Sequence, residues 1–253
     1  MTTPNDVLAS MIAILEARSQ LDERDHEAIL SLPHTVNHLE AGTYIVREGE
    51  ASTRCSILLE GFACRHKIVG DDARQIVGIY MAGDFIDLHS SILDAADENV
   101  QTLTAAKVAF IPIAAIEELT ASRPAVAQAM WAETLVNASR FAEWMANIGR
   151  RNAKTRMAHL LCELAVRQSA AGLGTTRYFE LPVTQEQLAD ALSLTPVHVN
   201  RTLRVLEAEG LISRDRRAIE VRDWERLERV GDFDTGYLHL RAQRGEQRVQ
   251  QAA

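Results

Sequence analysis

Apolar residues follow helical spacing at the start of the chain. Over residues 7–15 they recur at intervals of three and four, which is typical of one face of a helix. Leu21-Asp22 places a polar residue ahead of another such stretch, so a second short helix is predicted to begin there. Residues 1–31 are therefore predicted to be helical.

Residues 32–112 have a different pattern. Glycines separate short runs rich in β-branched and aromatic residues, such as TYIV, SILL, HKIV and VAFI. Short strands between turn signals indicate an antiparallel sandwich or barrel. Asp71-Asp72, between HKIV and RQIVGIY, is a predicted hairpin turn.

The helical pattern returns over residues 113–149. Pro124 suits the first turn of a helix, and Ser122 is predicted to cap it. From Pro124 to Ile148 no proline or glycine interrupts the pattern, and one apolar stripe steps alternately by four and three, as in a coiled coil. The stripe consists of Trp131, Leu135, Ala138, Ala142 and Met145. It predicts a homodimer interface, and a core helix within a single chain is the alternative.

A break follows at Gly149-Arg150-Arg151-Asn152. Asn152 can cap the next helix, where apolar residues from Met157 to Leu164 mark one face. This break is the predicted domain boundary and hinge.

Two short helices are predicted near the C-terminus. Thr184 and Gln187 have the spacing of a capping box, which opens the first helix. Ser193-Leu194 is the predicted turn. Thr195 then caps the second helix, and Pro196 occupies the first helical position, where its missing amide hydrogen costs nothing. Two helices joined by a tight turn form a helix-turn-helix, whose second helix enters the major groove of DNA.

The second helix and the segment after it complete this motif. Val199, Leu203 and Leu206 form its predicted buried stripe, and Gly210 ends it. Two short strands, LIS and AIEV, follow on either side of the basic turn Arg214-Asp215-Arg216-Arg217. This basic hairpin is the predicted wing of a winged helix-turn-helix, placed to meet phosphate.

The charge distribution supports DNA binding by one end of the chain. Residues 1–149 hold 10 basic and 21 acidic side chains (net −11), and residues 150–253 hold 17 basic and 14 acidic (net +3). The overall charge of −8 hides this split. No run approaches the roughly 18 apolar residues that span a bilayer, and the start lacks the basic region of a secretory signal. We expect a cytoplasmic protein that does not contact a membrane.

Three segments, in order, resemble the Crp/Fnr superfamily. TQEQLADALSLTPVHVNRTLRVLEAEGLI resembles its DNA-reading unit, AGTYIVREGEASTRCSILLEGFACRHKI its cyclic-nucleotide-type β-roll, and PAVAQAMWAETLVNASRFAEWMANIGRR its dimerisation helix and hinge. The resemblance implies an α+β fold with an N-terminal antiparallel, jelly-roll-like β-roll, a long dimerisation helix and a C-terminal winged helix-turn-helix. The expected domains are N-terminal helices and sensor-type β-roll (1–122), dimerisation helix (123–149), DNA-binding domain (150–240) and a flexible tail (241–253).

The resemblance also implies which side chains meet DNA bases. The base-reading candidates are Pro196, Val197, His198, Asn200 and Arg201. Arg201 has the strongest chemical support, because its planar fork can bind guanine O6 and N7 together. Val197 departs from the family, where a glutamate is common, and valine offers only an apolar contact, such as one to a thymine methyl group. His198 could instead touch phosphate or solvent alone.

Phosphate contacts set the register of the protein on DNA without reading sequence. The predicted phosphate-binding residues are Lys154, Thr184, Gln185, Thr195, Arg204, Arg214, Arg216 and Arg217.

The candidate effector pocket departs from the family at several positions. Leu88 falls where a ribose-binding glutamate would be, and no arginine occurs between Arg74 and Arg123 to bind a cyclic phosphate. Phe141 and Ala142 replace hydroxyl side chains on the long helix. We therefore do not expect cyclic AMP or cyclic GMP in the usual mode. The pocket candidates are Leu88, His89, Ser90, Ser91 and Phe141.

No cofactor is predicted. The N-terminus lacks the cysteine cluster of iron–sulfur relatives, and Cys55, Cys64 and Cys162 are expected to be small buried residues. Haem ligation by His89 or His66 is an open alternative. The regulator is therefore either a sensor that binds haem or another small molecule, or a constitutively active protein.

An enzyme is not expected. A cupin-like metalloenzyme would use histidines such as His34 and His38, yet the chain has no His-x-His pair. No Gly-rich phosphate loop or nucleophile-elbow motif is present either.

The predicted function is a homodimeric, sequence-specific transcription regulator that binds double-stranded DNA. Its two heads should meet successive major grooves of an inverted repeat, about 34 Å apart. The resemblance implies RNA polymerase as a partner, with contact at loop 170–177. Residues 223–240 are expected to form a helix-like brace after the wing.

Overall fold

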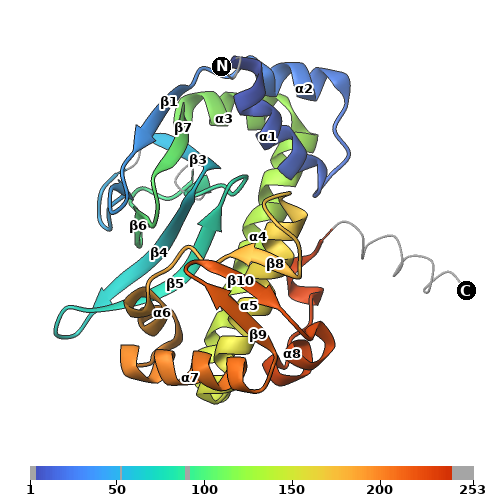
Figure 1. The fold of residues 1–253 in the computed structure, drawn as a ribbon. Coiled ribbons are helices and arrows are strands. Elements are labelled where there is room, and N and C mark those ends of the chain that lie inside the picture. Colours follow the sequence, from blue (N-terminus) through green and yellow to red (C-terminus); the bar gives the residue numbers. More distant parts are fainter. Residues whose placement is uncertain (1–3, 52, 89–91, 241–253) are drawn as a thin grey trace, which may run out of the picture. The chain divides into compact units, whose positions relative to one another are not determined.

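The computed structural model describes residues 4–51, 53–88 and 92–240 (Figure 1). Among these, residues 4–66 and 79–138 form one compact unit, and residues 67–78 and 139–240 form the other. The division falls inside the long helix α4 (Pro124–Arg150) and inside strands β4 (Phe62–Val69) and β5 (Ala73–Met81), so each unit is described separately.

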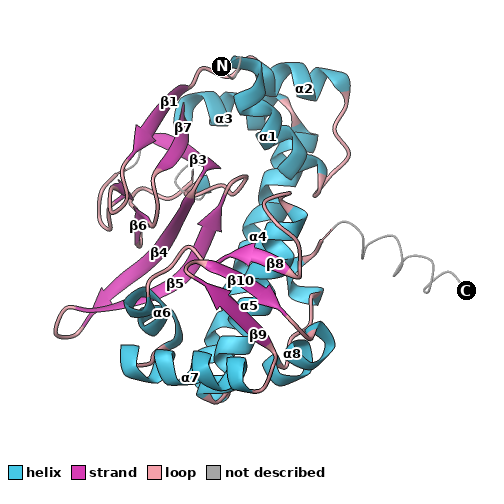
Figure 2. Cartoon of the chain, in the orientation of Figure 1, coloured by secondary structure: helices cyan, strands magenta, loops and turns pink. Residues whose placement is uncertain are grey.

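The first unit combines short helices with two antiparallel sheets (Figure 2). Its elements are α1 (Pro4–Glu16), α2 (Glu23–Leu30), β1 (Thr35–Leu39), β2 (Tyr44–Val46), β3 (Arg54–Glu60), β4 (Phe62–Val69) and β5 (Ala73–Met81) apart from their hairpin end at residues 67–78, β6 (Asn99–Thr102), β7 (Ala106–Pro112), α3 (Ile113–Ser122) and the start of α4 (Pro124–Arg150). One sheet has the order β1-β7-β3 and the other β2-β6-β4-β5; we call them together the β-roll. The predicted antiparallel architecture is confirmed.

Local sequence signals account for several of these boundaries. Asp22 caps α2 in a reciprocal capping box with Asp25, as the second-helix prediction required. Asp72, with φ of +60°, forms the predicted turn between β4 and β5. The capping prediction for Ser122 is wrong. Its hydroxyl donates to the carbonyl oxygens of Glu118 and Leu119, because Ser122 is the last residue of α3 and those acceptors lie one turn behind it.

The core of the first unit packs helices against β3 and β7. Buried residues from α1, α2 and α3 meet the inward residues of these strands and the first turns of α4, including Leu8, Ile29, Ile57, Ile111, Ile116 and Val126. A second cluster fills the β-roll around Leu58, Val100 and Val108. Both faces of β3 and β7 are buried, and successive residues along these strands contribute alternately to the two clusters.

The second unit contains the remainder of α4, then helices that pack beside a three-stranded sheet (Figure 1). Its elements are α5 (Ala153–Ala170), β8 (Tyr178–Glu180), α6 (Gln185–Leu192), α7 (Pro196–Ala208), β9 (Ile212–Asp215), β10 (Ala218–Val221), α8 (Trp224–Gly231) and the 3-10 helix η2 (Gly236–Leu238). The sheet order is β8-β10-β9. Strand β8 lies outside the predicted elements; its three residues pair with β10 and bury Phe179.

Helix α4 is continuous from Pro124 to Arg150, two residues beyond the predicted Ile148. Most of the predicted stripe is exposed on the single chain: Trp131 by 69%, Leu135 by 55% and Met145 by 74%. Single exposed apolar side chains are common, but an exposed apolar stripe along one helix face is typical of an interaction surface.

The cysteines and the absence of a membrane-spanning segment were two further expectations. All three cysteines are buried, as predicted. No described helix is both long and apolar enough to cross a membrane.

Candidate DNA-binding surface

Helices α6 and α7 with the hairpin β9–β10 form the candidate DNA-binding surface, here called the reading head. Thr184 Oγ1 accepts from Gln187 N at 3.1 Å, and Gln187 Oε1 accepts from Thr184 N at 2.8 Å, which confirms the capping box. Ser193 ends α6 in the left-handed conformation, with φ of +51°. The chain therefore turns sharply and starts α7 within three residues.

Helix α7 is held by its predicted N-cap and buried stripe. Thr195 Oγ1 accepts from His198 N at 3.3 Å, and Pro196 occupies the first turn. Val199, Leu203 and Leu206 are fully buried, as predicted. Gly210 follows the helix at φ of +70°, a conformation that favours glycine.

The opposite face of α7 is exposed and polar. Pro196, His198 and Arg201 are exposed, and the Val197 side chain is 80% exposed. An open depression of about 570 Å³ runs along this face. Its lining contains the predicted DNA contacts Gln185, Pro196, Val197, Asn200, Arg201 and Arg204. The fold thus gathers residues from both helices on one accessible surface.

Asn200 and Gln185 are linked across the two helices. Asn200 Nδ2 donates to Gln185 Oε1 at 3.2 Å. This bond orients the Asn200 amide and leaves its Oδ1 as an acceptor on the exposed face. Two other residues line the depression, Val205 and Ala208, which sequence reasoning missed. Their spacing from Arg201 by four and seven residues was the available signal.

The predicted phosphate-binding cations fall into two groups. Arg201, Arg216 and Arg217 are exposed and form no ion pair with any residue that the structure describes, and Arg204 is also exposed. Lys154 instead lies 2.5 and 2.7 Å from the two carboxylate oxygens of Glu209. Thus Lys154 contacts phosphate only if that pair opens or is shared.

Arg214 also binds a carboxylate within the fold. Its Nε and Nη2 donate to the two oxygens of Glu207 at 2.9 and 2.7 Å. Hydrogen bonding to Arg214 lowers the pKa of Glu207 below its ordinary value. Sequence reasoning missed this pairing, because Glu207 and Arg214 lie on different elements.

The wing has the predicted form. Strands β9 and β10 pair in register, with Ala218 opposite Asp215. Arg216 occupies the turn with φ of +55°. The Arg217 carbonyl accepts from Leu181 N at 2.7 Å, which fixes the backbone while the side chain stays exposed.

The candidate effector pocket is described only in part. His89, Ser90 and Ser91 lie outside the described residues. Leu88 is buried in the first unit, whereas Phe141 is half-buried in the second. His66 is buried on β4.

Charged groups inside the β-roll already have partners. The buried Arg65 pairs with Glu98 at 2.8 Å. Asp87 is buried and accepts from the Ser56 backbone amide at 2.5 Å, and burial raises its pKa to about 7. Within the described part of the chain, no three His, Cys, Asp or Glu side chains cluster as metal ligands would.

Two domain families match this chain. The cyclic nucleotide-binding domain matches residues 36–123, and the Crp-like helix-turn-helix domain matches residues 155–230. The chain is 30% identical to the transcriptional activator protein FnrL of Cereibacter sphaeroides, over 79% of this chain and 82% of the relative. It is 28% identical to the nitrogen fixation regulation protein FixK of Bradyrhizobium diazoefficiens, over 90% and 95% of the two chains.

A solved structure has the same fold. FixK2 from Bradyrhizobium japonicum superposes with a TM-score of 0.73 at 24% identity, over 79% of this chain and 98% of that chain. Together with the capped helix pair and the basic hairpin, these relatives establish the family. The chain belongs to the Crp/Fnr family of transcription regulators, with a DNA-binding helix-turn-helix domain.

Proposed function

We propose that this regulator binds an inverted-repeat operator as a homodimer and reads it through the exposed face of α7. The observation that carries the proposal is the position of Arg201 beside Val197 and Asn200 on one accessible face of a helix capped at its N-terminus. Arg201 reads guanine through O6 and N7, Asn200 supplies an acceptor, and Val197 makes an apolar contact. His198 is the fifth base-reading candidate.

Phosphate binding comes mainly from the wing and the helix termini. Arg216, Arg217 and Arg204 are exposed cations, and Thr184, Gln185 and Thr195 lie at the starts of α6 and α7, where helix dipoles favour anions. Lys154 and Arg214 contribute less to phosphate binding, because Glu209 and Glu207 already pair with them.

The dimer forms through α4. Trp131, Leu135 and Met145 are exposed at heptad spacing, and Ala138 and Ala142 between them allow close approach of a second helix. RNA polymerase is the proposed protein partner, with contact at the exposed loop 170–177. The cytoplasm is the proposed location.

The β-roll does not hold cyclic AMP or cyclic GMP in the usual way. Leu88 replaces the ribose-binding glutamate, and Arg65 is occupied by Glu98. Titration of purified protein with cyclic AMP, with operator affinity as the readout, should show no change. Nanomolar operator binding by colourless protein without additives would indicate constitutive activity.

Selection of bound DNA from a random duplex pool tests the main proposal. We expect an enriched inverted repeat whose half-site centres are about one helical turn apart. Recovery of unrelated duplexes with equal, salt-limited affinity would contradict sequence-specific binding.

A further inference from the structure

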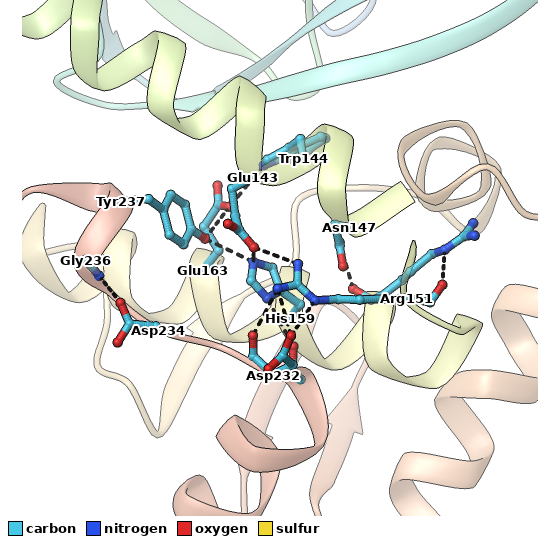
Figure 3. Close-up of polar contacts among 12 residues, drawn as sticks. Glu143, Trp144, Asn147, Arg151, His159, Glu163, Asp232, Asp234, Gly236 and Tyr237 are labelled. Atoms are coloured by element: carbon cyan, nitrogen blue, oxygen red, sulfur yellow. Dashed lines mark hydrogen bonds and ion pairs between the residues drawn. The ribbon is translucent and has the colours of Figure 1, made fainter. Parts of the chain in front are cut away.

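A fully buried carboxylate joins three segments of the second unit. Glu163 lies on α5 and is inaccessible to solvent. Trp144 Nε1, from the last turns of α4, donates to Glu163 Oε2 at 3.0 Å. Tyr237 Oη, from the segment after the wing, donates to the same oxygen at 2.8 Å (Figure 3). Arg167 donates to Glu163 Oε1 at 3.2 Å.

The segment after the wing is held against α5 at a second point. His159 Nδ1 lies 3.1 Å from the Gly231 carbonyl, and its ring stacks on Tyr237 with centroids 5.9 Å apart. A Cβ at Gly231 would come within 2.8 Å of the His159 backbone nitrogen, so glycine permits this approach. Burial lowers the pKa of His159, which favours the neutral ring, and Nδ1 donates to the Gly231 carbonyl because a carbonyl oxygen only accepts.

An outer ion-pair cluster spans the same three segments. Arg151, at the α4–α5 turn, pairs with Glu143 of α4 at 2.6 Å and with Asp232 after α8 at 3.1 Å (Figure 3). Asn147 of α4 donates to the Arg156 carbonyl of α5 at 3.3 Å. Thus the end of α4, the start of α5 and residues 231–237 hold one another.

These contacts favour one angle between α4 and α5. Rotating α5 away from α4 would remove Trp144 from a carboxylate that has no access to water, and a buried carboxylate that loses its donors is strongly destabilised. Helix α7 packs on α5, so the direction of α5 sets the direction of the reading head.

We propose that Tyr237 and Trp144 are positioning residues that, through Glu163, fix the reading head to the dimerisation helix and thereby set the operator spacing that the dimer accepts. The inference rests on the proposed function. A rigid link makes each half-site position matter, because one added base pair turns the second half-site by about 34–36° and shifts it by about 3.4 Å.

The test compares the selected operator with versions whose spacer is one base pair longer or shorter, and with a single half-site. Tyr237→Phe removes only the hydroxyl and keeps the ring beside His159. Tyr178→Phe is the control, because that residue is in the same unit and its side chain is 60% exposed. In Tyr237→Phe the affinity ratio between correct and shifted operators should fall about tenfold, as for one lost hydrogen bond to a charged group. Half-site affinity should stay close to that of the control, although the melting temperature falls because Glu163 loses one donor.

The outcomes separate this inference from the proposed function. The positioning role would be overturned if Tyr237→Phe left the affinity ratio between correct and shifted operators unchanged. It would also be overturned if the variant lost affinity equally for the half-site and for every operator. Absence of any spacing preference in the wild type would overturn it as well. A wild type that selects no operator at all refutes the proposed function instead. Should Tyr237→Phe fail to fold, Trp144→Phe removes the other donor and must give the same loss of spacing preference.

Discussion

Arginine side chains have opposite surroundings in the reading head and in the β-roll. In the reading head, Arg201, Arg216 and Arg217 are exposed and pair with no carboxylate in the described ranges. In the β-roll, Arg65 is buried against Glu98, and its guanidinium lies 5.1 Å from the Tyr80 ring centre. Exposed cations can exchange water and counterions for phosphate, whereas a buried cation needs a counterion inside the fold.

This difference shows that cations of the reading head, and not the buried Arg65 of the β-roll, are accessible to an anion from solution. The reading head places its exposed cations on the open face of α7 and on a hairpin turn, where a duplex can reach them. The β-roll has the fold of a nucleotide-binding domain, but the buried Arg65 is already paired. The comparison therefore predicts that the reading head binds DNA strongly and that the β-roll binds no cyclic nucleotide.

The largest expected effect is the pH dependence that the buried Asp87 gives to the stability of the β-roll. Burial raises the pKa of Asp87 from 3.8 to about 7, so between these values the folded protein keeps a proton that the unfolded chain has lost. The contribution of Asp87 to β-roll stability is fully present below pH 4, and roughly 4 kcal/mol is lost as the pH rises through about 7. Asp87→Asn should remove this dependence. Hydrogen exchange of β3 amides in urea, from pH 4 to 8, measures it.

The second unit should show the opposite trend. Because the pKa of His159 is lowered, its neutral form stabilises the fold above pH 6.5, and this contribution is lost as the pH falls below that value. Amides of α5 should therefore lose protection in acid. Protection of β3 that increases toward pH 8 in the wild type would contradict the assignment for Asp87.

Sequence reasoning succeeded where structure is determined within a few residues. The capping box of Thr184 with Gln187 and the cap of Thr195 each connect residues three apart, and both were predicted. The order of β-roll, long helix and helix-turn-helix follows from the same local signals and from the family resemblance. The prediction for Ser122 was wrong, because a serine at the end of one helix can donate to a carbonyl of the preceding turn as readily as it can cap the next helix.

Contacts between distant residues were beyond such reasoning. Lys154 and Glu209 are 55 residues apart, and Tyr237 and Glu163 are 74 apart. The Lys154 side chain could equally face phosphate or a carboxylate, and only the fold decides between them. Strand β8 is three residues long, too short for a periodic pattern to show.

The next largest effect tests the dimer. Leu135→Glu places a charge in the middle of the exposed α4 stripe and should yield monomers, because two like charges would face each other across the seam. Operator affinity should fall roughly 100-fold as two-site binding is lost. Light scattering and fluorescence anisotropy measure the two changes. Ile92→Glu, at a side chain that is 85% exposed in the first unit, should leave both unchanged. A dimeric Leu135→Glu protein would contradict the proposed interface.

A smaller effect tests base reading by α7. Arg201→Ala should reduce the preference for operator over unrelated DNA by about 10- to 100-fold, the worth of one bidentate contact to guanine. Arg226→Ala removes the same charge from a guanidinium that lies near Glu209 and should keep the preference. Competition binding with labelled operator measures both. Equal preference in Arg201→Ala and wild type would exclude Arg201 from base reading.

The smallest effect concerns the wing, and it distinguishes exposed from internally paired cations within the reading head itself. Replacing Arg216 and Arg217 by alanine should weaken binding to operator and to unrelated DNA alike, by a few-fold at moderate salt. The slope of log affinity against log salt should fall by about 2, since each phosphate contact contributes about 0.9. Arg214→Ala should change this slope less, because Glu207 already neutralises that side chain. A loss confined to the operator would show instead that the wing reads bases, and an equal slope change in Arg214→Ala would show that DNA displaces Glu207.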